Sequence, residues 1–439
     1  MKQCLSIIAV ALLLACPGFA QNSDADLLAR IEKLESELQS LKVQLGQPRE
    51  CADNADTNKP ASESQVTPQV SPAIPGAELA RRRQIYGLSS WTLLDKIAGE
   101  RTVVGGYADI EYRSFDGGSG KRTFNQQRYV IGAASRLTDD IFFSSELETE
   151  KAGPQNNQKD GEIKVEQAWL EYRLAKSLNF RGGVVLVPFG RLNVFHDSPI
   201  LDLTDRPLVD RLIIPTTWSE SAMGFQGSVN SSDESILTYE LYLMNGFNNT
   251  ISGSKGLRDA RGSETKDNNS NKAMVGRVGY SPKLGVELGV SGYTGKYDTD
   301  NKNSLSMLGA DLLYTKGPFE LRGEWVKVNI ERDSAAIASG IPAGMDGYYL
   351  EAAYHFFPER LRLTNPDRFG QSTFTGVVRY DSVDPDEGVL SSNDVKRLTL
   401  GVNFRPIEAA VFKLEYQWIN EAVSEIDNDG FVASAALSF

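Results

Sequence analysis

Cysteine and histidine are scarce in this chain, whose 439 residues include three cysteines and two histidines. Cys4 and Cys16 lie in a predicted cleaved leader, which leaves Cys51 as a free thiol or as half of an intermolecular bridge. The fold must therefore hold without an internal disulfide. No GxSxG, HExxH or Cys/His metal spacing occurs, so we expect no metal, no cofactor and no enzymatic activity.

Long apolar runs and basic tracts are also missing. Hydrophobic residues make up 41% of the chain, but after residue 20 no run approaches the roughly 20 apolar residues of a membrane-spanning helix. This excludes a helical membrane protein but not a transmembrane barrel, because barrel strands alternate apolar and polar residues. The formal net charge is -12 and the only compact basic cluster is Arg81–Arg83, so we expect no nucleic-acid partner.

The first hundred residues divide into three predicted segments. Residues 1–20 have the charge, apolar core and small terminal residues of a signal peptide, with a lipoprotein leader ending at Cys16 as the alternative. Residues 21–46 carry apolar side chains at heptad spacing, typical of a short periplasmic coiled coil or of an amphipathic helix lying on another surface. Residues 47–100 form a Pro-rich linker and a short pre-barrel segment, whose role the sequence leaves open, as it does that of Cys51.

From residue 101 to residue 439 the hydrophobic period is two. In 397–405, for example, Leu398, Leu400 and Val402 lie on one face and polar residues on the other. We expect an all-β fold, a 16-stranded antiparallel transmembrane β-barrel. The predicted strands are 102–114, 124–137, 140–150, 163–175, 178–187, 222–230, 235–246, 272–281, 284–295, 304–315, 318–331, 346–357, 372–382, 395–405, 410–421 and 430–439.

The connections between these strands alternate between short turns and long polar loops, as in outer-membrane barrels. One connection, 358–371, is too long for its side. The last strand ends on Phe439 with alternate apolar residues before it, which resembles the signal that outer-membrane assembly machinery reads. A closing strand that ends on Phe by chance is the alternative.

The longest connection, 188–221, is the candidate functional segment. Its many apolar residues and prolines suit a loop folded against the inner wall of the barrel, where it would narrow the pore. Its charged residues are the candidate pore constriction: Arg191, Asp197, Asp202, Asp205, Arg206 and Asp210. The alternative is that these charges only fix the loop to the barrel through buried ion pairs.

Alternation also predicts a basic wall facing the loop across the closure of the barrel. Its members are Arg113, Arg128, Arg136, Arg379, Arg397, Arg405 and Lys413. Basic and acidic residues on opposite sides of a pore would create a transverse field that orients charged solutes. Acidic residues share the predicted inward face in similar number, so the sequence leaves ion selectivity undetermined.

Three stretches, 161–170, 187–191 (Val-Pro-Phe-Gly-Arg) and 205–209 (Asp-Arg-Pro-Leu-Val), resemble bacterial porins of the phosphate-selective porin O and P group. The resemblance implies a trimeric, 16-stranded channel in outer-membrane lipids for passive diffusion of small hydrophilic solutes or ions. The family's phosphate-binding residues match no local motif here, so the resemblance implies the channel and not the phosphate preference. The alternatives are a barrel anchor, tether or adhesin of the cell envelope, and an outer-membrane hydrolase built on His196 or His355.

Overall fold

The computed structural model describes residues 101–117, 122–151, 161–230, 235–262, 266–391, 393–424 and 426–439. The predicted signal peptide, coiled coil and linker, residues 1–100, lie outside the described residues. Within the described part of the chain, no helix has the length and apolar character needed to cross a membrane.

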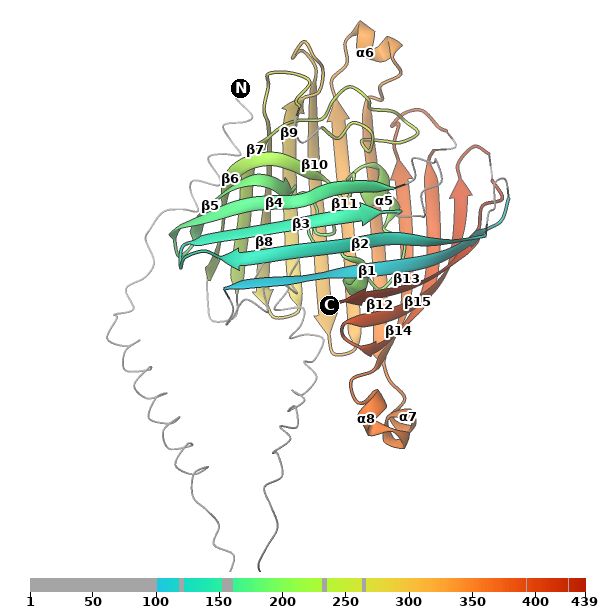
Figure 1. Ribbon diagram of the computed structural model, residues 1–439. Helices are drawn as coiled ribbons and strands as arrows, with labels where there is room; N and C mark the ends of the chain where they lie inside the picture. Colours follow the sequence, from blue (N-terminus) through green and yellow to red (C-terminus); the bar gives the residue numbers. More distant parts are fainter. Residues whose placement is uncertain are drawn as a thin grey trace, which may run out of the picture. The chain divides into compact units, whose positions relative to one another are not determined.

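The described residues form a closed antiparallel barrel in which every strand pairs with its neighbours in sequence and β1 pairs with β16 (Figure 1). The predicted fold class is confirmed, and most strand ends fall within two residues of the expected positions. The strands are β1 Thr102–Phe115, β2 Thr123–Arg136, β3 Ile141–Glu150, β4 Glu162–Ala175, β5 Leu178–Leu186, β6 Ser219–Asn230, β7 Ile236–Met244, β8 Ala273–Lys283, β9 Val286–Lys296, β10 Ser304–Lys316, β11 Phe319–Ile330, β12 Gly344–Phe356, β13 Thr373–Asp384, β14 Val395–Ile407, β15 Ala410–Glu421 and β16 Gly430–Ser438.

The two faces of each strand differ as the alternation predicts. On β14, Arg397 and Thr399 are buried at 1% and 0% exposure, whereas Leu398 and Leu400 are 38% and 45% exposed. Polar side chains therefore point into the lumen and apolar ones point outward, the arrangement of a barrel in lipid.

The outward surface is not uniform around the barrel. Across β2, β3 and β4, the neighbouring outward residues Ala133, Ser145 and Ala168 are all small. Across β13, β14 and β15 the corresponding neighbours are Tyr380, Leu398 and Trp418. The outward surface of β2–β4 therefore includes one row of small side chains, whereas the named positions on β13–β15 carry large apolar ones.

Short turns and long loops alternate at the two ends of the barrel. The end where β1 begins has turns such as 176–177 and 317–318, and we call it the short-turn end. Its exception is 357–372, which carries α7 (Glu359–Thr364) and α8 (Pro366–Phe369). The other end has the long loops, including 187–218 with η1 (Ser198–Ile200) and α5 (Leu208–Leu212), 245–272, and 331–343 with α6 (Ser334–Ala338).

Candidate functional site

The loop 187–218, which we call the constriction loop, lies inside the barrel. We expected it to extend to residue 221, but it ends at Trp218 because β6 begins at Ser219. Val187, Phe189, Ile213 and Trp218 are at most 1% exposed and belong to the main apolar cluster, together with inward residues of several strands. Burying apolar side chains against the inner wall stabilises this placement.

A second loop covers the constriction loop from the long-loop end. The Trp218 ring stacks on Phe247 of loop 245–272 at a centroid distance of 4.5 Å. The Leu257 N–H donates to the Leu212 carbonyl (2.9 Å), and Arg261 Nη1 donates to the Thr217 carbonyl (2.6 Å). This contact could not be predicted from the sequence, because pairing between two loops leaves no periodic signal.

Asp205 of the constriction loop is held by arginines from two strands. Arg113 on β1 donates from Nη2 to Oδ1 (2.6 Å) and from Nη1 to Oδ2 (3.2 Å). Arg397 Nη1 on β14 lies 3.7 Å from Oδ2. Burial alone would raise the pKa of Asp205, but Arg113, Arg211 and Arg397 hold that pKa below its usual range.

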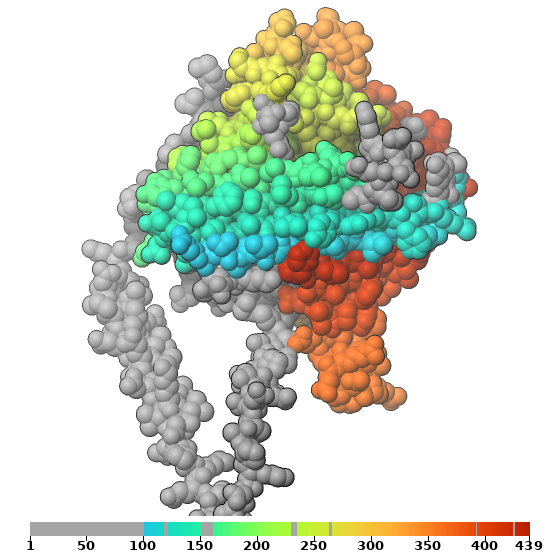
Figure 2. All heavy atoms as spheres, viewed as in Figure 1, coloured from blue at the N-terminus to red at the C-terminus, as the bar shows by residue number. Residues whose placement is uncertain are grey.

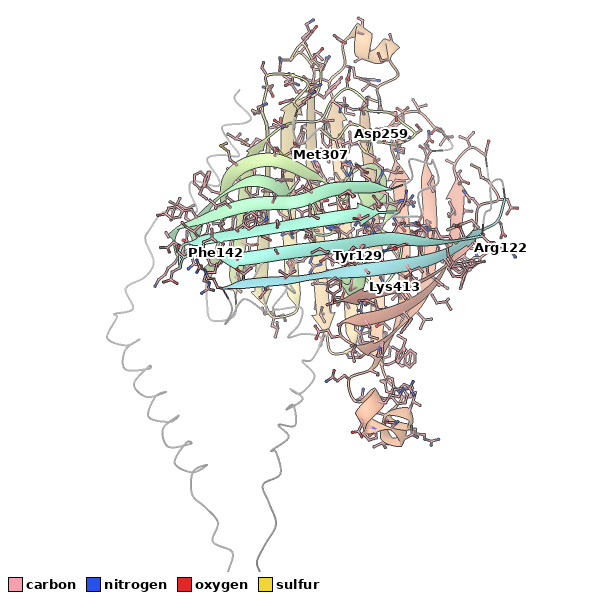
Figure 3. All side chains as sticks on the ribbon, in the orientation of Figure 1. Arg122, Tyr129, Phe142, Asp259, Met307 and Lys413 are labelled. Atoms are coloured by element: carbon pink, nitrogen blue, oxygen red, sulfur yellow. The ribbon has the colours of Figure 1, made fainter. Side chains whose placement is uncertain are left out.

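Asp202 is held in the same way, by arginines of β11 and β14. Arg322 on β11 donates to Oδ2 (2.8 Å), and Arg405 on β14 lies 3.5 Å from Oδ1. Arg405 and Lys413 also donate to backbone carbonyls of the loop between Ser198 and Leu203; Lys413 is labelled in Figure 3. The basic wall therefore anchors the loop directly, which favours the anchoring role for these charges over an open transverse field.

The remaining basic candidates occupy different places. Arg379 is buried between Glu351 and Asp381, at 3.3 and 3.2 Å. Arg128 contacts Glu148 at 2.8 Å. Arg191 pairs with Glu287 of β9 at 3.1 Å. Arg136 does not reach the loop, because it is exposed at the short-turn end of β2, with its guanidinium 5.3 Å from the Phe142 ring centre.

Asp197 lies beside a buried histidine. His196 is fully buried, with Nδ1 2.9 Å from the Asn193 carbonyl and Nε2 2.8 Å from Glu166 Oε1. Asp197 has no arginine partner within the described residues, and burial together with Glu146 and Glu166 raises the pKa of its carboxyl well above its usual value. This histidine is packed away from solvent, so it is poorly placed to act on a solute.

Asp210 of α5 faces Glu324 of β11. The two carboxyl groups are close enough to interact electrostatically, and Asp210 Oδ1 accepts a hydrogen bond from Thr216 Oγ1 (3.4 Å). Burial and the Glu324 carboxylate raise the pKa of Asp210 well above its usual value. A carboxyl pair of this kind is stable only while it holds a proton.

The guanidinium of Arg206 has a single hydrogen-bond partner among the described residues. Arg206 is 8% exposed, and Nη1 donates to Thr217 Oγ1 (3.1 Å). Nε and Nη2 are buried and have no hydrogen-bond partner among the described residues. Burial and the nearby Arg128 lower the pKa of Arg206 to about 10, so the guanidinium remains a cation at neutral pH.

Two small spaces lie between the constriction loop and the wall. Leu192, Leu201, Arg322 and Tyr349 line both of them. Arg322 was not among the predicted site residues, although alternation places it on the same face as Glu320 and Glu324. No cluster of three His, Cys, Asp or Glu side chains suited to a metal ion occurs in the described part of the chain.

Phe439 follows β16 directly. Its backbone pairs with Gly106 of β1 (3.0 and 3.1 Å), and its ring stacks near Tyr129 of β2 at 6.3 Å. The residue therefore lies at the closure of the barrel, on its outward surface, with 48% of its side chain exposed.

A closed barrel with apolar residues outside and a charged, loop-lined lumen defines an outer-membrane channel protein. The model of the family described as phosphate-selective porin O and P matches residues 101–310 and 299–438, and the chain belongs to this family of porins.

An uncharacterized protein of Aquifex aeolicus (strain VF5) is 24% identical over 331 residues, covering 71% of this chain and 74% of that protein. Among solved structures, Salmonella typhi OmpF in complex with daunomycin is 11% identical with a TM-score of 0.53, covering 77% of this chain and 97% of that one. An anion-selective porin from Comamonas acidovorans is 10% identical with a TM-score of 0.50, covering 77% and 99%. At these identities the two structures show a common fold.

Proposed function

We propose that this outer-membrane porin passes small inorganic anions, and that the positive charge of Arg206 favours them. The observation that carries the proposal is the buried guanidinium of Arg206, whose Nε and Nη2 have no partner among the described residues. Its positive charge makes the electrostatic potential of the adjoining lumen more positive, and this favours passing anions. The description of the family as phosphate-selective supports an anionic solute.

Accessible cations near the long-loop end of the barrel also support a preference for anions. Arg211, on α5, is exposed. Arg113 and Lys164 retain 27% and 25% exposure of their side chains although both have carboxylate partners. Cations that remain accessible along an entrance raise the local concentration of anions. Arg322, Arg397 and Arg405 are paired with carboxylates of the constriction loop and hold it in place.

Reversal potentials in planar bilayers with a KCl gradient test this proposal. We expect the wild-type protein to prefer chloride, Arg206→Gln to lose most of that preference, and the charge-conserving Arg206→Lys to keep it. Added phosphate should reduce the chloride current in the wild type more than in Arg206→Gln. A cation-preferring wild-type channel, or an unchanged reversal potential in Arg206→Gln, would refute the proposal.

We further propose a homotrimer assembled through the wall β2–β6. The outward small residues Ala133, Ser145 and Ala168 support this choice, because small side chains allow two walls to approach closely in lipid. The outward Ser145 hydroxyl would also be better placed against a partner than in hydrocarbon. The number three rests on the resemblance to trimeric porins.

Cross-linking tests the interface. In a Cys51→Ser background, Ser145→Cys should cross-link between copies, whereas Val378→Cys on β13, 41% exposed, should not. Equal cross-linking at both positions would contradict the proposed wall. We also propose that Phe439 is the assembly signal and that the chain has no enzymatic activity, which the burial of His196 supports.

A further inference from the structure

The connection 357–372, which we call the short-end hairpin, is unlike the other described turns at its end of the barrel. It carries α7 and α8, and neither helix contains a buried residue. Every residue from 358 to 368 is exposed. Figure 2 shows the hairpin in orange, projecting beyond the strands beside it. The hairpin projects beyond the end of the barrel, so a role in lining the lumen does not explain it.

Aromatic rings connect the hairpin to the lipid-facing surface. The Phe357 ring lies 5.6 Å from Phe374 and 5.8 Å from Phe369. Phe374 in turn lies 4.7 Å from Phe404 and 5.9 Å from Phe356. Phe356, Phe374 and Phe404 are on the outward faces of β12, β13 and β14, so the rings continue an aromatic belt at the boundary of the hydrocarbon.

The hairpin also carries the cations that suit a lipid interface. The guanidinium carbons of Arg362 and Arg368 lie over the Phe357 and Phe369 rings, at 5.3 and 5.6 Å. Arg360 is exposed beside them, and no carboxylate pairs with any of the three within the part of the chain that the structure describes. Leu361 and Leu363 are 38% and 70% exposed. Apolar side chains next to arginines suit the region between acyl chains and phosphates.

We propose that the short-end hairpin lies in the head-group region of the inner leaflet and that its arginines bind the phosphates of anionic phospholipids. Short turns face the periplasm in outer-membrane barrels, so the hairpin meets the periplasmic leaflet. Continuity with the aromatic belt places Phe357 and Phe369 at the depth of the glycerol groups. The three arginines outnumber Glu359 and Asp367, which favours anionic over zwitterionic lipid. This inference does not depend on which solute the channel passes.

Depth measurements on the whole protein test the proposal. A nitroxide attached at Leu363→Cys in a Cys51→Ser background would be placed in vesicles of phosphatidylcholine, with and without phosphatidylglycerol. We expect collisions with oxygen to exceed collisions with a water-soluble nickel complex, and the ratio to rise several-fold when phosphatidylglycerol is present. Ile337→Cys on α6, at 57% exposure on a helix at the opposite end, is the matched control and should report water in both vesicles.

A triple variant separates charge from apolar contact. Arg360→Gln, Arg362→Gln and Arg368→Gln together should abolish the response to phosphatidylglycerol while single-channel conductance stays unchanged. Three results would overturn the proposal: water exposure at position 363 equal to that at 337, the same depth with and without phosphatidylglycerol, or dipolar broadening between labels that disappears on dilution with unlabelled protein. The last would show that a second copy of the chain occupies the hairpin.

Discussion

The constriction loop 187–218 and the short-end hairpin 357–372 have similar ingredients but opposite positions. Each carries three arginines, several leucines and phenylalanines, and prolines. The loop lies in the lumen with most side chains buried, whereas the hairpin is exposed throughout its helices. The two segments differ in their partners. Four inward arginines on three strands bind the loop, and no buried partner holds the hairpin. Loop composition therefore does not decide burial; the wall beside the loop does.

We expect the largest difference in stability between variants that lose one aromatic ring from each segment. Trp218→Ala removes a ring that contacts Phe189, Phe247 and Tyr293, so we expect a loss of about 3–5 kcal/mol in the free energy of unfolding. Phe369→Ala on the hairpin should cost well under about 1 kcal/mol, because its ring is partly exposed. Denaturant titrations followed by the gel mobility of folded protein measure both. Equal midpoints would mean that the loop contributes no more than the hairpin.

We expect a smaller difference in stability and protease protection between variants that lose one aspartate from each segment. Asp205→Asn leaves Arg113 and Arg397 without their shared carboxylate, and breaking a buried pair costs about 3 kcal/mol. We therefore expect trypsin to cut after Arg206 or Arg211 in this variant under conditions where the wild-type loop is protected. The matched Asp367→Asn, on the exposed hairpin, should change neither protection nor stability. Protection that survives in Asp205→Asn would assign this aspartate to ion selectivity instead.

The same comparison indicates how far the sequence could predict this molecule. The period of two identified all sixteen strands, because each side chain on a barrel strand faces either lipid or lumen. It also suggested that the apolar loop folds inward. The individual ion pairs could not be predicted from the sequence. Asp202 of the loop meets Arg322 because closure of the barrel and the register of its strands bring β11 next to the loop. Arg136 shares the inward parity of Arg128, yet its position at the strand end keeps it from the loop.

The two segments should also differ in their response to pH. Arginines hold the pKa of Asp205 below its usual value of 3.8, so its stabilisation is present above that pH and is lost as the pH falls through the lowered pKa. Burial and Glu324 raise the pKa of Asp210, so its stabilisation is complete below pH 3.8 and is lost as the pH rises through the raised pKa. Arg206 and Asp381 also face Asp210 and partly oppose each other.

We therefore expect the constriction loop to loosen as the pH rises through the raised pKa of Asp210, when Asp210 and Glu324 repel each other. Asp210→Asn should remove this loosening, because an amide can donate to Glu324 without a titratable proton. Protease protection of the loop, measured from neutral to alkaline pH, distinguishes the two proteins. The hairpin, with no buried carboxyl, should show the same protease sensitivity throughout. A loop that loosens at the same pH in Asp210→Asn would assign the transition to another group.

The smallest effect on the channel is expected when the hairpin is removed altogether. Phe356 of β12 is paired with Phe374 of β13, so a two-residue turn can connect these strands as it does elsewhere at this end. We expect the shortened protein to fold and to conduct with unchanged ion preference, because all contacts of the constriction loop remain. Planar-bilayer recordings measure this directly. A changed reversal potential would show that the hairpin influences the lumen. It would contradict the assignment of ion preference to the constriction loop and of lipid contact to the hairpin.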